Sequence, residues 1–339
     1  MNATDDGCGR WKGTANMNKE DGKKAGLKVG TVALIGRPNV GKSTLLNRML
    51  GQKIAIVSDK PQTTRISILG IKTSERGQVI FVDNPGIHRP LHKLNKRMMN
   101  FVYASLETSD LICLLIDASQ KFGHGDQFVI ETLKNVQTPL ILLINKVDIV
   151  KKEKILLIID HYKDLLPFKE IIPISALKGT NLDVFEKIIT ESLPVAEKIY
   201  DDEEISVQSE RFLLAEIIRE KVLNHVEQEL PWATAVYIDQ IEKRSVEEAG
   251  AGSKTQPAEI PGKKKRPLIY IKARIFVERD NHRIIILGRH GQLIKTIGTE
   301  ARREIEDILK AKVFLDLEVK VKDRWRDSAD VLDLIEGQK

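Results

Sequence analysis

Residues 36–43 read Gly-Arg-Pro-Asn-Val-Gly-Lys-Ser, with two glycines five positions apart and Lys and Ser directly after the second. This is the spacing of a P-loop, whose backbone N–H groups surround the phosphates of a nucleotide. The apolar run 29–35 before it predicts a buried strand, and residues 44–50 after it have helical spacing up to Gly51, a typical helix stop. The motif requires this strand–turn–helix context. The sequence therefore predicts a nucleoside triphosphate site in an α/β fold.

The side chains of the P-loop are predicted to have separate roles. Lys42 is expected to reach the β- and γ-phosphates, and the Ser43 hydroxyl to ligate Mg²⁺. Asn39 either favours the turn or helps to coordinate K⁺ beside the phosphates, where an arginine finger would act, and the sequence leaves both readings open. The residues predicted to contact the nucleotide here are Gly36, Asn39, Val40, Gly41, Lys42, Ser43 and Thr44.

A second motif concerns the base. Residues 145–148 read Asn-Lys-Val-Asp and follow the apolar run 140–144. The Asp148 carboxylate can accept from the ring N–H and the exocyclic amine of guanine, a donor pair that adenine lacks, so this pairing discriminates strongly. Asn145 is predicted to bond the base and brace neighbouring loops, and the stem of Lys146 to lie across the ring. Backbone N–H groups that face the guanine oxygen are expected from Ser175, Ala176 and Leu177. The predicted ligands are GTP and GDP.

Two loops are expected to sense the γ-phosphate. An Asp-Asn-Pro-Gly sequence begins at Asp83, whose carboxylate is predicted to hold Mg²⁺ through water, while the Gly86 N–H bonds the γ-phosphate. Residues 54–65 contain Thr63 and Thr64, and one of these hydroxyls should complete the Mg²⁺ shell while GTP is bound. Thr64 is favoured, and spacing does not exclude Thr63. The predicted metal ligands are Ser43, Thr64 and Asp83, and the predicted catalytic residues are Lys42, Thr64 and Gly86.

Ile87 occupies the position after Asp-x-x-Gly where Ras-like enzymes carry a water-orienting Gln. An aliphatic side chain cannot orient water. Hydrolysis is therefore expected to rely on another residue, on the substrate phosphate, on a partner or on a cation, with slow intrinsic turnover.

Length and composition limit the architecture. The chain has 339 residues, of which 42% are hydrophobic and 30% charged, which is enough for about two domains. Two cysteines are too few for a disulfide framework. No apolar run reaches the roughly 18–20 residues of a membrane-spanning helix. A net charge of +6 permits a polyanionic partner. Residues 1–27 lack the pattern of a signal peptide and are interpreted as a disordered extension.

Residues 28–200 alternate apolar strands with amphipathic helices, which predicts a mostly parallel sheet with helices on both faces. Ligands of such sheets bind outside the carboxyl ends of the strands. Because every motif above follows a predicted strand, the motifs should converge on one crevice. The predicted strands are 29–35, 66–72, 78–83, 111–117, 139–144 and 170–174.

Residues 201–339 predict a second, α+β domain. The predicted order is helix, strand, strand, helix, helix and strand, which is typical of a type II KH domain. Residues 243–266 are rich in Ser, Gly, Glu, Lys and Pro and are predicted to form a mobile loop. The elements are expected at 208–228, 234–241, 268–277, 284–309 (two helices around a turn) and 313–321.

Gly288 and Gly291 frame a Gly-x-x-Gly loop at the start of a predicted helix. Such a loop lets a phosphodiester approach the backbone, as in the clamp that KH domains close on single-stranded RNA. The same tetrapeptide also serves as a plain turn, but the basic residues around it and the order of the elements favour RNA. The predicted RNA contacts are Gly288, Arg289, His290, Gly291, Lys295 and Arg302.

From residue 28 to about residue 333 the chain resembles the Era family of bacterial GTPases. The family usually has Thr where this chain has Asn84 and an Asn-Lys-like pair where it has Arg289 and His290, and residues 1–27 and 243–266 are outside the common pattern. The resemblance rests on GRPNVGKS (36–43), PQTTR (61–65), DNPG (83–86), NKVD (145–148), SALKG (175–179), SERFLLAEIIREKV (209–222), ELP (229–231) and ILGRHGQLIKTIGTEAR (286–302).

The resemblance implies a GTP-hydrolysing switch whose KH domain binds the 3′ end of 16S rRNA during assembly of the 30S ribosomal subunit. It also implies a cytoplasmic protein that associates peripherally with the inner membrane. Two other functions stay open. One is an RNA chaperone or scaffold in which GTP turnover is incidental, and the other is a membrane-surface signalling GTPase that uses its basic loop on anionic lipid.

Overall fold

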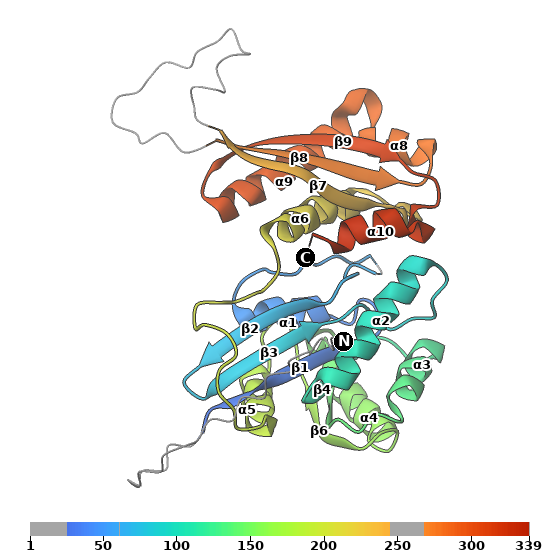
Figure 1. Ribbon diagram of the computed structural model, residues 1–339. Coiled ribbons are helices and arrows are strands. Elements are labelled where there is room, and N and C mark those ends of the chain that lie inside the picture. The colour runs from blue at the N-terminus through green and yellow to red at the C-terminus, as the bar shows by residue number, and fades with distance from the viewer. Residues whose placement is uncertain (1–25, 61, 245–267, 339) are drawn as a thin grey trace, which may run out of the picture.

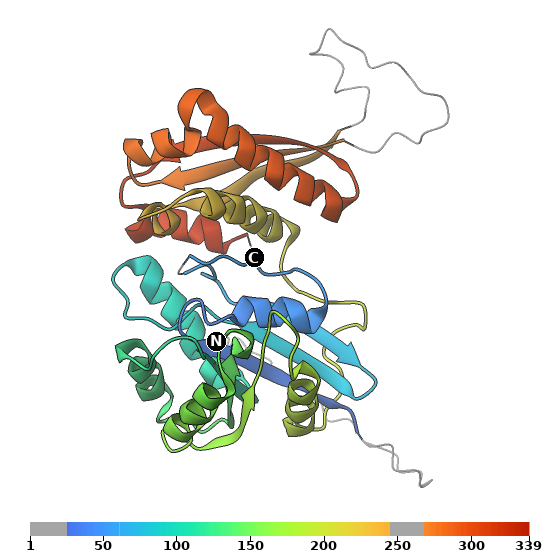
Figure 2. The ribbon, with the colours of Figure 1, turned by 180° about the vertical axis from the view of Figure 1, so that it is seen from behind.

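The computed structural model describes residues 26–60, 62–244 and 268–338. Two units, each a sheet with its helices, are stacked on one another (Figure 1, and from behind in Figure 2). The first unit contains six strands and the second contains three. The predicted N-terminal extension 1–27 and the predicted mobile loop 243–266 lie outside the described residues, apart from two residues at one end of each.

The sheet of the first unit has the strand order β2-β3-β1-β4-β5-β6. Strand β2 is antiparallel to β3, and the other neighbours are parallel. The predicted, mostly parallel sheet is thus confirmed, with strand ends shifted by at most two residues. Its strands are β1 (Lys28–Gly36), β2 (Ile68–Ser74), β3 (Gly77–Asp83), β4 (Leu111–Asp117), β5 (Leu140–Asn145) and β6 (Phe168–Pro173).

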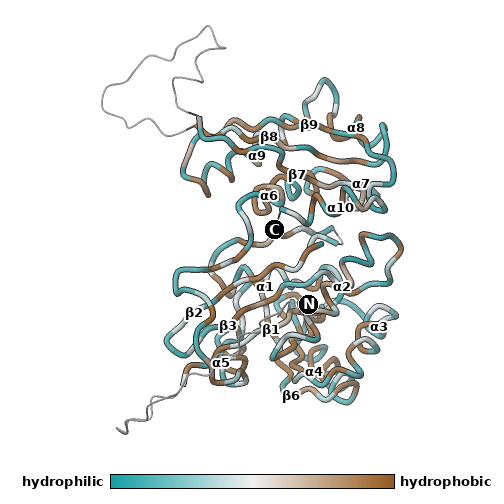
Figure 3. The backbone as a smooth tube through the Cα atoms, in the orientation of Figure 1, coloured by the Kyte–Doolittle hydropathy of each residue, from teal (hydrophilic) through white to brown (hydrophobic). Residues whose placement is uncertain are grey.

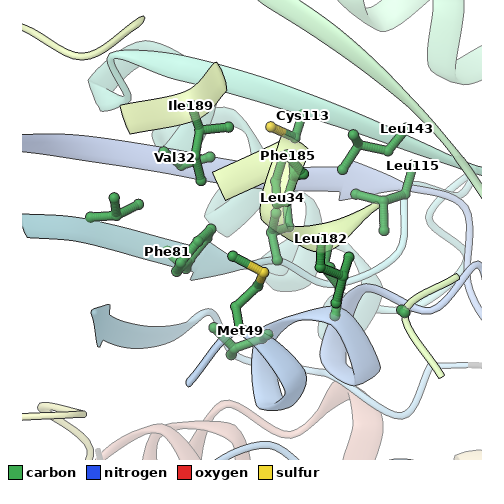
Figure 4. Packing of buried hydrophobic residues seen from close by; sticks show 14 of the residues in the cluster. Val32, Leu34, Met49, Phe81, Cys113, Leu115, Leu143, Leu182, Phe185 and Ile189 are labelled. Carbon is green, nitrogen blue, oxygen red and sulfur yellow. The ribbon is translucent and has the colours of Figure 1, made fainter. Parts of the chain in front are cut away.

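Helices cover both faces of this sheet because its central strands are apolar on both sides. Val32 and Leu34 of β1 pack with α1 and α5, whereas Ala33 and Ile35 pack with α2, α3 and α4. Figure 4 shows the first of these layers, with Phe185 of α5 against the sheet. The helices are α1 (Lys42–Leu50), α2 (Lys93–Thr108), α3 (His124–Leu133), α4 (Lys152–Tyr162) and α5 (Leu182–Ser192).

The second unit has a sheet of order β7-β8-β9, with β7 antiparallel and β9 parallel to β8. Helices α6, α8 and α9 share one apolar core with it. In Figure 3, apolar residues run through the strands of both sheets. The predicted order of elements is confirmed. The elements are α6 (Glu210–His225), α7 (Leu230–Ala233), β7 (Ala235–Arg244), β8 (Leu268–Val277), α8 (Asp280–Leu287), α9 (Gln292–Leu309), β9 (Lys312–Val321) and α10 (Ala329–Glu336).

Some predicted bounds in the second unit are wrong. The helix expected at 208–228 ends at His225, and a separate turn, α7, follows with Pro231 at its start. Strand β7 continues to Arg244, three residues beyond its predicted end, because it pairs with β8 as far as Leu268. Helix α10 was not expected. It forms because its apolar residues pack, together with the fully buried Trp325, against α2 of the first unit.

Candidate functional site

The P-loop connects β1 to α1 in a conformation that glycine permits. Gly36 and Gly41 have φ angles of 150° and 100°. A Cβ on Gly36 would lie 2.3 Å from the Leu115 carbonyl oxygen, and one on Gly41 would lie 2.3 Å from Asn145 Nδ2. A Cβ on Gly86 would lie 2.5 Å from the backbone nitrogen of Pro38, so the loop after β3 is pressed onto the P-loop. The P-loop and the Asp-Asn-Pro-Gly loop therefore meet at the carboxyl ends of neighbouring parallel strands.

Lys42 is buried under the P-loop. Its ammonium donates to the carbonyl oxygens of Gly36, at 3.2 Å, and of Arg37, at 2.9 Å. Burial lowers the pKa of Lys42 to about 8, although the nearby Asp83 carboxylate acts in the opposite direction. An ammonium held against the backbone of a P-loop is suited to binding phosphate.

Three side-chain oxygens from three segments converge beside Lys42. Ser43 Oγ donates to Asp83 Oδ2 at 2.6 Å, and Thr64 Oγ1 lies 2.9 Å from Ser43 Oγ and 3.3 Å from Asp83 Oδ2. The other oxygen, Asp83 Oδ1, is buried and has no hydrogen-bond partner. Burial raises the pKa of Asp83 to about 6. Hydroxyl and carboxylate oxygens with an unsatisfied buried acceptor can hold a hard divalent cation.

Thr63 and Thr64 point in different directions. Thr63 Oγ1 donates to the Lys60 carbonyl oxygen at 2.6 Å, within its own loop. Thr64 Oγ1 faces Ser43 and Asp83. The two threonines that spacing left as alternatives therefore differ in geometry, and only Thr64 reaches the oxygen cluster.

On the base side, Asn145 connects two loops. Its Nδ2 donates to the Val40 carbonyl oxygen at 2.7 Å, and its Oδ1 accepts from the Ala176 N–H at 2.9 Å. The next residue, Lys146, has a φ of 66°, and its ammonium lies 2.7 Å from Asp117 Oδ2. Asp117 was not predicted. It follows the same rule as the other motifs, since it is the last residue of β4, and that rule would have found it.

A cleft of about 790 Å³ joins these features. It is lined by the P-loop, by residues 56–59 and 62–64, by Gly86 and by Lys146. It continues along α4, where Phe122 and His161 stand edge to face at 4.7 Å between ring centroids. Of the residues predicted for the nucleotide site, those outside the lining of the cleft are Gly36, Asp83, Asn145, Asp148, Ser175, Ala176 and Leu177. Asp148 is exposed at the same edge of the sheet.

Ile87 lies in the core and not in the cleft. It is 2% exposed and packs with Ala33 and Ile35 below the sheet edge, while its N–H donates to the Gly36 carbonyl oxygen at 3.0 Å. The position that carries a water-orienting Gln in Ras-like enzymes is therefore used here for packing. Asn39 has a φ of 63°, and its Nδ2 donates to the Asp59 carbonyl oxygen, which ties the P-loop to the loop that carries Thr64.

The Gly-x-x-Gly loop lies between α8 and α9 in the second unit. Gly288 and Gly291 have φ angles of 70° and 74°, in the left-handed region. A Cβ on Gly291 would meet nothing within 4 Å, so the backbone there is open to an approaching group. Ile284 and Ile285, which are not among the predicted RNA contacts, expose 62% and 49% of their surface on α8 beside the loop. Exposed positions are also found for the predicted residues Arg289, His290, Lys295 and Arg302.

Comparisons with known proteins agree with both parts of this picture. A family profile described as "50S ribosome-binding GTPase" matches residues 31–146, and a KH domain profile matches residues 258–326. The chain is similar to the crystal structure of Era in complex with MgGDPNP and nucleotides 1506–1542 of 16S ribosomal RNA, at 38% identity and a TM-score of 0.82. That match covers 91% of this chain and 98% of the other. An Aquifex aeolicus Era variant bound to GDP and AlF₄⁻ matches with the same identity and TM-score, over 91% of this chain and 99% of the other.

Proposed function

The chain belongs to the Era family of GTPases, and from that membership we propose that it is a GTP-dependent switch which binds the 3′ end of 16S rRNA and acts in assembly of the 30S subunit. It is a GTPase with a KH domain. The observation that carries the proposal is the joining, in one chain, of a P-loop cleft and an open Gly-x-x-Gly loop. A relative that shares this fold over nearly its whole length was crystallised with nucleotides 1506–1542 of 16S ribosomal RNA.

We propose that Mg²⁺ binds with the nucleotide at Ser43, Thr64 and Asp83. The support is the convergence of their oxygens and the buried, unsatisfied Asp83 Oδ1. When bound, Mg²⁺ supplies charge neutralisation of the phosphate oxygens. Lys42 adds a fixed positive charge and Gly86 an N–H at the γ-phosphate. These residues would bind and orient the phosphates. Positioning and electrostatic stabilisation of this kind account for most of the catalysis of phosphoryl transfer.

A water-orienting side chain is absent at Ile87, so another group must compensate. We propose that K⁺ takes that part and replaces the hydrogen bond that Asn39 Nδ2 donates to the Asp59 carbonyl oxygen, with the Asn39 amide turned so that its oxygen and the Asp59 carbonyl oxygen both face the cation. Oxygen ligands of this kind suit an alkali cation next to phosphates.

Exchange of K⁺ for Na⁺ at equal ionic strength is expected to lower kcat on the order of tenfold, because the smaller Na⁺ is held less well by the same oxygens and the charge beside the γ-phosphate is lost. The change Asn39→Ala should remove the difference between the two salts while leaving GDP affinity within about twofold. Phosphate release is the measurement, and GDP affinity is the control for an intact P-loop. Equal rates of the unchanged protein in KCl and NaCl would contradict this role of Asn39.

The RNA partner is tested by binding of a short RNA that matches the 3′ end of 16S rRNA, against a scrambled RNA of the same composition. Binding is measured at one fixed salt concentration, since the phosphate backbone makes affinity strongly salt-dependent. With a non-hydrolysable GTP analogue the matching RNA should bind at least about tenfold more tightly than the scrambled one, as a specific site requires. With GDP this preference should shrink. Equal binding of both RNAs would exclude a sequence-specific rRNA site.

Two finer points complete the proposal. We place the protein in the cytoplasm, where an rRNA-binding GTPase finds its substrate. Peripheral contact with the inner membrane stays a prediction. Within the described residues, no helix combines the length and apolarity needed to cross a bilayer.

A further inference from the structure

The loop that carries Thr64 runs from the cleft to the second unit. The next residue, Arg65, is buried there, and its guanidinium donates to carbonyl oxygens at the end of α7. The distances are 2.7 Å to Thr234, 2.9 Å to Pro231 and 3.3 Å to Trp232. Carbonyl groups at the end of a helical turn attract a cation. Arg65 therefore fixes one side of Thr64 to the second unit.

The residue on the other side of Thr64 is held from the same unit. Arg219 of α6 is buried, and its Nη2 donates to the Thr63 carbonyl oxygen. Glu216, one turn earlier in α6, accepts from Arg219 Nε at 2.7 Å and from Nη2 at 2.5 Å, which fixes the guanidinium. Thr64 is thus flanked by two arginine contacts to the second unit.

Trp325 also contacts the Arg65 side chain. The guanidinium lies 5.6 Å from the centroid of the Trp325 ring, within the range of a cation–π interaction. The indole N–H donates to the Ala233 carbonyl oxygen at 2.8 Å, and the ring is fully buried. The end of α7 and Trp325 therefore form a buried binding site for the Arg65 side chain of the loop that carries Thr64.

We propose that Arg65 and Arg219 are positioning residues for GTP: Arg219 holds the Thr63 carbonyl and Arg65 anchors its own side chain in the second unit, and together they keep the Thr64 hydroxyl at the Ser43–Asp83 cluster. GTP with its cation needs that hydroxyl in place, whereas GDP does not. The second unit then raises affinity for GTP selectively. By linkage, GTP strengthens the contact between the units by the same factor.

The buried charges keep the net free energy of this contact between the units small. Arg65 Nε and Arg219 Nη1 are buried without a hydrogen-bond partner. Both guanidiniums are thus buried, and Glu216 offsets part of their charge by pairing with Arg219. Buried charges of this kind add little net stability. A small difference in binding free energy between GTP and GDP is therefore enough to decide whether the contact forms.

Other contacts between the units are less suited to this role. Lys53, near the start of the same loop, lies 2.7 Å from Glu220 and 2.6 Å from Glu304, but its side chain is 37% exposed. Exposed ion pairs contribute little because water and salt screen them. Arg97 of α2 pairs with Asp333 at 2.6 Å on another part of the interface, away from the Thr64 loop. The buried arginine pair is therefore the contact to test, and Arg97 offers a matched control.

The test compares the affinities of the full chain for a fluorescent GTP analogue and for the matching GDP derivative, with and without Mg²⁺. The changes Arg219→Lys and Arg65→Lys keep the charge but remove the planar fork of the guanidinium. Each is expected to weaken binding of the GTP analogue about tenfold in the presence of Mg²⁺, to leave GDP affinity within about twofold, and to have little effect without Mg²⁺. Arg97→Ala, which also breaks a contact between the units, should leave the ratio of the two affinities unchanged.

A double change separates positioning from general loss of structure. Thr64→Ala should lower the GTP-analogue affinity as the arginine changes do, and combining it with Arg219→Lys should add little, since both act through one hydroxyl. Thermal unfolding shows whether each variant is folded. An equal loss for both nucleotides, an unchanged ratio in both arginine variants, or the same change of ratio in Arg97→Ala would overturn the proposal. None of these readouts depends on RNA, so they stand apart from the rRNA assignment.

Discussion

Asp148→Asn should turn a guanine-selective protein into one that prefers xanthine nucleotides. The Asp148 carboxylate is predicted to accept from the ring N–H and the exocyclic amine of guanine. An amide in its place presents a donor to that amine and leaves the amine unpaired, whereas the second carbonyl oxygen of xanthine can accept from the amide. Sites that read a base by such bonds reject the wrong partner strongly, so GTP affinity should fall on the order of 100-fold or more.

The measurement is competition of GTP, GDP, XTP and XDP with a fluorescent guanine nucleotide, followed by phosphate release from GTP and XTP. Recovery of hydrolysis with XTP would show that the variant is folded and that only base recognition has changed. Asp307→Asn, which removes an exposed carboxylate of α9 in the second unit, is the control and should bind GTP normally. If Asp148→Asn kept its preference for GTP, the base would be read elsewhere.

Gly291→Asp is expected to abolish selective RNA binding and to leave nucleotide binding intact. The φ of Gly291 is 74°, a conformation that Asp and Asn tolerate better than other side chains. A Cβ there would touch nothing within 4 Å, so the domain should still fold. The added carboxylate would face an RNA phosphate at close range, and repulsion between like charges with partial screening should weaken binding on the order of 100-fold.

Gly291→Asn is the matched control because it has the same shape and the same tolerance of positive φ without the charge. It should lose much less affinity for the 16S rRNA 3′ end than Gly291→Asp. Gel-shift or anisotropy titrations at one salt concentration give the comparison, and GDP affinity reports on the distant cleft. Equal, large losses in both variants would mean that the backbone at Gly291 needs a bare glycine. Unchanged binding in both would place the RNA elsewhere on the domain.

Several features could be predicted from the sequence because neighbouring residues determine them. Gly36 and Gly41 predict a loop with positive φ angles between a strand and a helix, and the structure has that loop. The strands β1 to β6 follow from apolar runs of strand length with helices between them, which only a mostly parallel, doubly covered sheet accommodates. The Gly-x-x-Gly loop and the order of elements predicted the KH domain for the same reason.

The site was predictable where its residues follow strand ends. Ser43 and Asp83 were named from their motifs, and their oxygens lie together. Asp117 was missed although it ends a strand, because no motif marks it. Spacing could not separate Thr63 from Thr64, since neighbouring residues share the same motif and only the folded loop decides which hydroxyl faces inward.

Contacts between residues far apart in the sequence belong to the tertiary structure alone. Arg65 and Arg219 read as ordinary basic residues, one after a threonine pair and one on an amphipathic helix. Their burial against Thr234 and Thr63 appears only when the two units are stacked. Helix α10 likewise forms a face against α2 that its own short apolar pattern does not specify. Periodicity and glycine encode local conformation, but the partner of a side chain more than 150 positions away depends on how whole units pack.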